Sequence, residues 1–476
     1  MPIQQMFLGS GGVASDSYWL FRGDYTGGSG LQPTNKEAGM GTMELDADGS
    51  VYLAIGAESL YPNFFKLSNK GDVQWRRSLQ LSGYYSPATG IELNGDYMYA
   101  VTWKSWDSMQ VSKISKSDGS INSFYKIATG SSEYVGYDKD NGCAAMCSGA
   151  NSDDLVCAAT TSYSRYGYVV YNIDTSGNYN SQVVRSPSPL STRNGFSSNS
   201  LKKLADGNIW LGFTATFSGS GYYYNSCGLV NLGSSGTGGG SGSQLYSPSQ
   251  SNANRYAGGG MAYRNLSGTV NIFQGGGTRN WNGHTNAWRR VPTVIKHSSG
   301  GWAQNVYQVH CHRSDGDGQN GLFNDVAVDE DGNIYAVGRN SFSSIGGECG
   351  YLAKFNSSMQ LQFWRVLRWD GVSGGSELYR IEITPNGSML IAGKVGKEAF
   401  CCQLPPDGSL TGTHGSFIYE DYSSDRTVSV NPSGSPSYTN AGISSQSTYG
   451  AVGTSVSSFT PSNQNLYYST TKTIPS

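Results

Sequence analysis

Charged side chains are scarce in this sequence. Asp, Glu, Lys and Arg make up 14% of the 476 residues, well under the usual quarter. Long helical patterns of Lys, Glu and Leu are also missing, which argues against a helical domain. The chain instead holds 65 Gly and 32 Tyr, and strand-forming and turn-forming residues alternate along it. This composition indicates a turn-rich, all-β protein whose core comes from many short strands.

Other absences exclude several classes of partner and location. The formal net charge is −2 and no basic stripe is present, so we expect no nucleic acid partner. No run approaches the roughly 20 apolar residues of a membrane span. The opening residues 1–12 lack a basic stretch followed by a long apolar one, so we expect no secretory signal. The 8 Cys show no framework spacing, which favours free, buried thiols and assembly in a reducing cytoplasm.

The clearest structural pattern runs from Asp325 to Leu367. Apolar residues fall at about every second position, which is the side-chain period of a strand. Segments rich in Gly, Asn, Asp and Ser interrupt them, as turns do. The segment therefore predicts four short strands, with a tight turn at Asp329–Asn333 between the first two.

This four-strand unit recurs along the chain. Its first turn can be aligned at Gly49, Gly95, Gly207, Gly268, Gly332, Gly387 and Gly434, and once near Asp153 without a glycine. Successive turns lie about 46 to 64 residues apart, a spacing typical of propeller blades. We count seven complete units and an eighth whose end is doubtful, all within one domain, residues 15–476.

The residues that precede the first unit suggest how the ring closes. Ser17–Gly28 resembles the last strand of a unit, with Trp19 in the place of Trp75 and Trp364. A competing closing strand is Leu466–Ile474. Pairing the two termini would remove two open sheet edges. We therefore expect a single β-propeller of about eight four-stranded blades, closed by N- and C-terminal strands, with seven blades as the alternative.

Metal sites have little support in the sequence. Asp-x-Asp-Gly occurs at Asp46 and Asp329, but between two strands it is a favoured hairpin turn and it lacks the other calcium ligands. Asp315 and Asp317 lie in a longer loop, where calcium stays open. His310 and His312 would share one face of a strand and could meet one cation, yet zinc needs two more ligands at a recognisable spacing. We predict no metal site, with these two pairs left open.

Catalysis also lacks a signature. No Gly-x-Ser-x-Gly turn is present, and the adjacent acidic pairs are those of solvated turns. We therefore predict no enzyme activity and no cofactor, although the centre of a propeller can gather residues from different blades. Two aromatic segments, Tyr222–Tyr224 and Arg279–Arg290, look like loops that could stack on sugars or contact proteins. The alternative is that these rings are strand residues that fill space between blades.

The N-terminal segment carries a specific resemblance. Its sequence, MPIQQMFLGSGG followed by DSYW, resembles the opening of many virion proteins of marine, especially cyanobacterial, tailed phages. In these, Gln-Gln-Met-x-Leu-Gly-x-Gly-Gly precedes Asp-x-Tyr/Phe-Trp. The repeats are similar to propeller-like repeats in such proteins and in quinoprotein-like propellers, but residues that would hold a quinone or metal have no counterpart here.

The resemblance implies a structural component of a phage virion, assembled in the host cytoplasm and present in multiple copies. It would be tail-associated, as a fibre, nozzle or adsorption protein that mediates assembly or host attachment. Residues 1–14 would form a virion-anchoring peptide, with Ile3, Met6, Phe7 and Leu8 docking on other virion proteins. A host surface glycan or receptor would be a further partner. The alternatives are a capsid decoration protein and a tail lectin or carbohydrate-active enzyme.

Overall fold

The structure is a computed structural model. It describes residues 18–23, 42–55, 63–78, 90–104, 108–128, 144–161, 167–176, 179–188, 191–195, 200–219, 222–237, 242–245, 256–266, 269–282, 287–298, 303–312, 320–342, 345, 347–371, 375–396, 398–421, 427–433, 438–440, 442–445 and 472–473. The regular structure within these ranges is β, and no α-helix occurs in them. The predicted all-β class is therefore confirmed.

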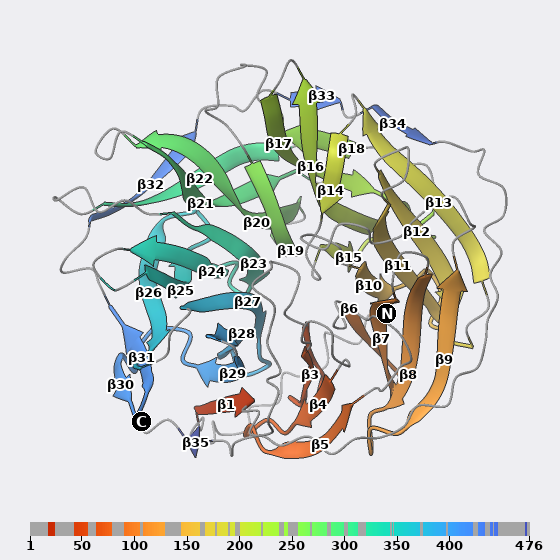
Figure 1. The fold of residues 1–476 in the computed structure, drawn as a ribbon, viewed down its shortest axis with the longest axis horizontal. Coiled ribbons are helices and arrows are strands. Elements are labelled where there is room, and N and C mark those ends of the chain that lie inside the picture. Colours follow the sequence, from red (N-terminus) through yellow and green to blue (C-terminus); the bar gives the residue numbers. More distant parts are fainter. Residues whose placement is uncertain are drawn as a thin grey trace.

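The strands form seven antiparallel sheets arranged in a ring, which we number as blades 1 to 7 in chain order (Figure 1). Blade 1 contains β2 (Met43–Leu45), β3 (Val51–Ile55), β4 (Asn63–Leu67) and β5 (Val73–Ser78), and blade 2 contains β6 (Gly90–Asn94), β7 (Tyr97–Lys104), β8 (Ser108–Ser115) and β9 (Ile121–Ala128). Blade 3 contains β10 (Ala144–Ser148), β11 (Asp154–Thr161), β12 (Gly167–Asp174) and β13 (Tyr179–Ser188). Blade 4 contains β14 (Ser191–Gly195) and β15 (Leu201–Lys203), both paired with β16 (Ile209–Gly219), then β17 (Tyr222–Asn231) and β18 (Gly242–Leu245).

The remaining blades follow the same plan from the centre of the ring outward. Blade 5 contains β19 (Tyr256–Leu266), β20 (Thr269–Asn282), β21 (Ala287–His297) and β22 (Ala303–His312). Blade 6 contains β23 (Leu322–Val328), β24 (Ile334–Phe342), β25 (Gly347–Phe355) and β26 (Leu361–Trp369). Blade 7 contains β27 (Ser376–Ile383), β28 (Met389–Val395), β29 (Glu398–Leu404) and β1 (Trp19–Gly23).

The number of blades is seven, the alternative count from the sequence, rather than eight. The predicted eighth unit, aligned on Gly434, forms no sheet of its own within the described residues. Its strands β32 (Thr427–Ser433), β33 (Tyr438–Asn440) and β34 (Gly442–Ser445) pair instead with the outermost strands of blades 5, 4 and 3. The repeat pattern reports strand and turn propensity, and it cannot tell an inner hairpin from strands that extend other sheets.

Strands from both termini lie in blade 7, as predicted for the closure of the ring. β1 pairs antiparallel with β29, from Trp19 opposite Gln403 to Gly23 opposite Ala399. The last described strand, β35 (Lys472–Thr473), pairs with the other edge of β1. The N-terminal strand thus completes the blade formed by the last complete repeat, so the ring closes through main-chain hydrogen bonds.

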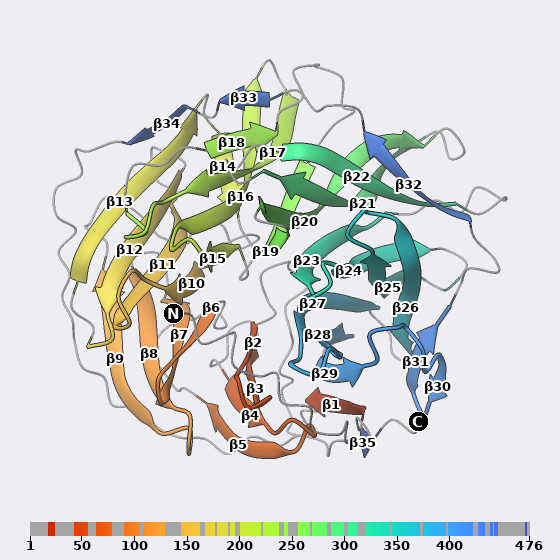
Figure 2. The same ribbon diagram turned by 180° about the vertical axis from the view of Figure 1, so that it is seen from behind.

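The chain that leaves blade 7 returns along the rim of the ring (Figure 2). β31 (Phe417–Glu420) pairs with β26 of blade 6, and β30 (Gly412–His414) pairs with β31. The chain then adds β32, β33 and β34 to blades 5, 4 and 3 in turn, the reverse of the order in which the blades were built. We call the segment from β30 to β34 the belt. It covers outer strand edges that would otherwise expose unpaired main-chain groups.

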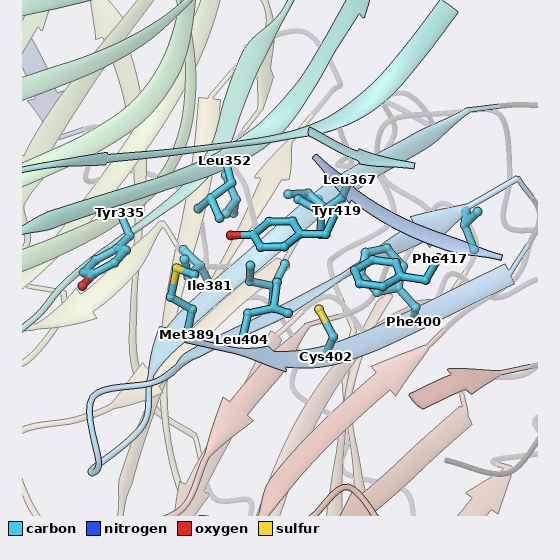
Figure 3. Packing of buried hydrophobic residues seen from close by; sticks show 14 of the residues in the cluster. Tyr335, Leu352, Leu367, Ile381, Met389, Phe400, Cys402, Leu404, Phe417 and Tyr419 are labelled. Carbon is cyan, nitrogen blue, oxygen red and sulfur yellow. The ribbon is translucent and has the colours of Figure 1, made fainter. Parts of the chain in front are cut away.

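The core lies between neighbouring blades, because the two faces of each sheet bury alternate side chains. Between blades 6 and 7, for example, Leu352 and Leu367 face Ile381, Met389 and other apolar residues of blade 7 (Figure 3). Two belt residues, Phe417 and Tyr419, lie in the same cluster with exposed fractions of 1% and 0%. The first belt strand is therefore part of the core, and not only an edge pairing.

The turn at Asp329–Asn333 is the hairpin predicted from its sequence. The Asp329 carboxylate accepts hydrogen bonds from the backbone and side-chain amides of Asn333, both at 2.8 Å, and from the Tyr335 hydroxyl at 3.1 Å. Gly332 has a φ of 81°, which glycine adopts at little cost. These bonds satisfy the carboxylate inside the turn.

A second contact recurs between neighbouring blades, from blade 7 to blade 1 and from blade 1 to blade 2. The Trp19 indole donates to the Asn69 carbonyl at 3.2 Å, and the Trp75 indole donates to the Lys116 carbonyl at 3.0 Å. Each carbonyl belongs to the last turn of the following blade. The ring of Trp19 also covers Gly71 so closely that a Cβ there would lie 2.5 Å from it. The tryptophans of the fourth strands therefore fix the spacing of adjacent blades.

The predicted equivalence of Trp75 and Trp364 is wrong by one residue. Trp75 lies opposite Lys66, and the residue opposite the equivalent Lys354 is Phe363. A shift of one position along a strand moves a side chain to the other face of the sheet. Trp364 therefore packs toward blade 5, in the cluster shared by blades 5 and 6.

Candidate functional site

Charged residues from five blades meet at the centre of the ring. The innermost strands β2, β6, β15, β23 and β27 carry Glu44, Glu92, Lys202, Asp325, Arg380 and Glu382, which we call the central cluster. The sheets converge on the axis of a propeller, so side chains that are far apart in sequence become neighbours there. The cluster combines four carboxylates with two cations.

Arg380 is the buried hub of the cluster. Its side chain is 2% exposed, and the Asp325 carboxylate 3.3 Å away is fully buried. Two more carboxylates, those of Glu44 and Glu382, lie 3.5 Å from the same guanidinium, and it also donates to the Met43 carbonyl at 2.9 Å. A break in the register of β27 just before Arg380 re-aims the side chain at this point. Arg380 thereby joins blades 6, 7 and 1.

Asp325 is held by blade 7 through a second bond. Its carboxylate accepts from the Ile381 backbone amide at 3.0 Å as well as from the guanidinium. Burial lowers the pKa of Arg380, but the facing carboxylates, Asp325 first among them, more than offset this and leave it raised. Arg380 therefore keeps its charge, and because it is buried away from water it depends on the facing carboxylates to offset that charge.

Lys202 reaches across the ring from blade 4 to blade 7. Its ammonium lies 4.0 Å from the Glu382 carboxylate, and both side chains are about a quarter exposed, at 25% and 24%. Burial lowers the pKa of Lys202, and the charges of Glu382 and Glu44 outweigh that effect, so the net shift is upward. Because blades 4 and 7 stand on opposite sides of the ring, this ion pair spans its centre (Figure 1).

Glu92 is a member of the cluster whose acidity is strongly perturbed. Burial, with the nearby charge of Glu44 next, raises the pKa of Glu92 to about 8, against the opposing effects of Lys202 and of hydrogen bonds from Ser148. Burial likewise raises the pKa of Glu44. A raised pKa shifts this carboxyl toward its protonated form, the direction expected of a group that donates a proton.

The residues singled out from the sequence have different outcomes. The predicted anchor residues Ile3, Met6, Phe7 and Leu8 lie outside the described residues, as do Asp315 and Asp317. His310 lies on β22, where its ring nitrogen bonds the Gln308 carboxamide oxygen at 3.1 Å; the side chain of His312 is not described. Within the described residues no group of three His, Cys, Asp or Glu could hold a metal ion.

Two smaller expectations can also be compared with the structure. Both segments contain strand residues rather than loops alone: Tyr222–Tyr224 begins β17, and residues 279–282 and 287–290 belong to β20 and β21. Strand residues at these places pair with neighbours, as Trp281 does with Trp288. The six cysteines whose surroundings are described are free and buried, as expected.

The central cluster itself was missed in the sequence. A signal for it exists: Glu44, Lys202 and Glu382 stand at one register position, opposite the second residue of the next strand. A charged residue stands at that place in the inner strands of blades 1, 4 and 7. It could have indicated a shared polar centre. The arrangement as a whole does two things chemically: it links blades by ion pairs, and it holds one carboxyl, that of Glu92, whose pKa is raised.

Comparisons with known proteins add the fold alone. No family model and no curated protein matches the chain. Among solved structures, the periplasmic gluconolactonase PpgL of Pseudomonas aeruginosa is 13% identical and covers 87% of this chain and 98% of its own, with a TM-score of 0.38. Drosophila Semaphorin 1a, extracellular domains 1–2, is 11% identical over 80% of this chain and 88% of its own, with a TM-score of 0.42.

A third similar structure is the Penicillium chrysogenum alpha-L-arabinanase complexed with arabinobiose. It is 10% identical and covers 67% of this chain and 93% of its own, with a TM-score of 0.37. At these identities and TM-scores the likenesses carry no conclusion about catalysis here. The part of the chain that the structure describes contains no helix long and apolar enough to span a membrane.

Proposed function

We propose that this chain is a non-enzymatic structural component of a phage virion, associated with the tail, which mediates assembly or host attachment. The N-terminal resemblance to virion proteins of marine tailed phages supports the proposal that the protein is part of a virion. The closure of the ring at both its centre and its rim is the observation that best supports a structural role. Ion pairs cross the centre, and the belt covers outer edges of blades 3 to 6.

Such closure suits a particle exposed to proteases and to other proteins. Covered edges resist unwanted strand pairing, and ion pairs that bind opposite blades oppose opening of the ring. The proposed partners are other virion proteins, reached through the N-terminal peptide, with a host glycan or receptor at a free face. The protein would be present in multiple copies in each particle.

Deletion of residues 1–12 tests the anchor. We expect a folded propeller with an unchanged melting temperature, and virions that lack the protein. A matched variant, with Ile3, Met6, Phe7 and Leu8 all changed to Ser, should lose incorporation to a similar degree, because apolar burial would drive docking. Normal incorporation of the deletion variant would refute the anchor, whatever the fold of the rest.

Capsid decoration is the alternative position in the particle. Both positions agree with a closed propeller and an N-terminal anchor, so copy number separates them. Quantitative mass spectrometry of purified virions should give on the order of ten copies for a ring around the tail, since closed rings of subunits are small. Hundreds of copies would instead assign the protein to the capsid surface.

A carbohydrate-active role is favoured by one feature, the Glu92 carboxyl at the centre, whose pKa is raised by burial and by the nearby Glu44. Purified protein incubated with host surface polysaccharide distinguishes the cases. If the protein neither binds nor cleaves the polysaccharide, the result agrees with a purely structural role. Binding without cleavage indicates a lectin. Cleavage that disappears in the Glu92→Gln variant would establish an enzyme with Glu92 as its acid.

A further inference from the structure

The ring is complete without the belt. Each blade already has its four strands, because β1 supplies the fourth strand of blade 7 and so joins the last blade to the first. The belt strands β31 to β34 are additions to sheets that are closed before they arrive. The belt also runs against the order of the blades along the outside of the ring. Its part beyond β31, the strands β32 to β34, can therefore leave the rim without opening any blade.

The distal part of the belt, strands β32 to β34, which we call the distal belt, is held by main-chain pairing. β32 lies opposite β22 over seven consecutive residues, from Thr427 opposite His312 to Ser433 opposite Val306. Pro432 has no N–H to donate, so its pair with Tyr307 must be a non-hydrogen-bonded one. Hydrogen-bonded and non-hydrogen-bonded pairs alternate along an antiparallel ladder, so Ser429 and His310, three positions away, form a hydrogen-bonded pair. β33 and β34 pair in the same antiparallel manner with β18 and β13.

The proximal belt, strands β30 and β31, is held far more firmly than the distal belt, because side chains hold it as well. Phe417 and Tyr419 are buried in the core between blades 6 and 7, and the Glu420 carboxylate receives two bonds from Arg368, at 2.9 and 3.1 Å. In β32, the packing that is described comes from Val428 and Val430, which are only partly buried against the cluster of blades 5 and 6. The belt therefore has a specific anchor followed by an arm that a main-chain ladder holds.

We propose that this arm, β32 to β34, exchanges between copies of the chain. The arm of one copy then pairs with β22, β18 and β13 of a neighbour in the register seen within a single copy. Every copy presents the same three edges and the same arm, so the exchanged and unexchanged pairings gain equal main-chain bonds. Exchange of identical elements is a low-cost route to association. The partner that this surface fits is a second copy of the same protein.

A disulfide trap in the full chain tests the exchange. His310→Cys with Ser429→Cys joins β22 to β32, and a hydrogen-bonded antiparallel pair has the Cα separation of about 5.5 Å that disulfides accept. The six described native cysteines are buried, and Cys143 and Cys227 are changed to Ser in the same background. After mild oxidation at a series of protein concentrations, non-reducing gels separate intrachain from interchain links.

We expect interchain dimers whose share rises in proportion to concentration while they are the minority. Ser341→Cys with Glu348→Cys, a pair inside blade 6, should stay intrachain throughout and serves as the control. Gln308→Cys with Asn431→Cys repeats the trap one ladder step away, should the first pair disturb folding. Intrachain links alone at every concentration, or no link in either trap, would overturn the proposal. This test needs no phage particle, so its outcome is separate from that of the proposed function.

Discussion

The centre and the rim of this propeller are held together by different kinds of bond. At the centre, named side chains do the work, since Arg380 contacts three carboxylates from three blades. At the rim, strands of the distal belt add to blades 5, 4 and 3 by main-chain pairing. The difference teaches where sequence matters most. A change of one charge alters the centre, whereas a main-chain ladder tolerates most residues and excludes proline only from positions that must donate a ladder hydrogen bond.

Exposure to solvent explains why side-chain ion pairs are used at the centre and main-chain pairing at the rim. Arg380 and Asp325 at the centre are removed from water, so each must have a partner within a few ångströms. Outer edges face water, where unpaired main-chain groups lose little energy but invite other strands. The centre is thus built for strength and the rim for protection. The four predictions below test this contrast, beginning with the largest expected effect.

Replacing the buried arginine should be the most damaging change. Arg380→Met leaves the fully buried Asp325 carboxylate without its cation, and removing one partner of a buried pair costs about 3–5 kcal/mol of unfolding free energy. The matched rim variant is Arg368→Met, whose partner Glu420 is 30% exposed. It should cost less than about 1 kcal/mol. Urea denaturation of both variants measures the difference.

A similar loss in the two arginine variants would show that the centre is no more demanding than the rim. The double variant Arg380→Met with Asp325→Leu adds a further check. Because it removes both charges together, it should regain part of the stability lost in Arg380→Met. No recovery would mean that the arginine acts mainly through its packing or its bond to the Met43 carbonyl.

The contact between blades should give the next largest effect. Gly71 and Gly207 have φ values of 82° and 83°, so an alanine is strained equally at both. A Cβ at Gly71 would lie 2.5 Å from the Trp19 ring, whereas one at Gly207 meets nothing within 4 Å. Gly71→Ala should therefore cost about 1–3 kcal/mol more than Gly207→Ala, the usual cost of overpacking. Thermal unfolding of both variants checks this, and equal losses would show that the turn moves away freely.

The sequence was sufficient for the blades because their pattern is local. The alternation from Asp325 onward and the turn at Gly332 both arise within a few residues, and so does the Trp19 strand that closes the ring. The blade count failed for a non-local reason. β32, β33 and β34 look like the strands of one unit, yet each lies on a different sheet. Strand propensity does not specify the partner strand.

The central cluster could not be assembled from the sequence for a related reason. Lys202 and Glu382 are separated by more than a third of the chain, and the residues around one do not indicate that it pairs with the other. Only the closed ring places them 4.0 Å apart. A recurring charge at one register position could have suggested a polar centre, but not which charges pair. Nor could it have shown that Glu92 would be buried enough to keep its proton.

The acidity of Glu92 gives the third prediction. Its pKa is about 8 in the folded protein and about 4.3 in an unfolded chain, so the folded state binds more protons between these values. Stability from this group is thus full below about pH 4 and is lost as pH rises toward 8, by at most about 1.4 kcal/mol per pH unit. Glu92→Gln should raise the melting temperature relative to wild type at pH 8.5 and change it little at pH 4.5. An equal difference at both pH values would contradict a protonated Glu92.

The smallest effect on global stability should come from the distal belt. Ser429→Pro removes a ladder bond to β22, whereas Ser429→Ala keeps the backbone intact and serves as its control. Since the ring closes without this strand, we expect Ser429→Pro to lower the unfolding free energy by less than about 1 kcal/mol, the net value of one hydrogen bond. Hydrogen exchange should nevertheless quicken at the outer amides of β22 while the amides of β27 at the centre stay protected. If the central amides lost protection equally, belt and ring would unfold as one unit, and the division between a strong centre and a separable rim would have to be abandoned.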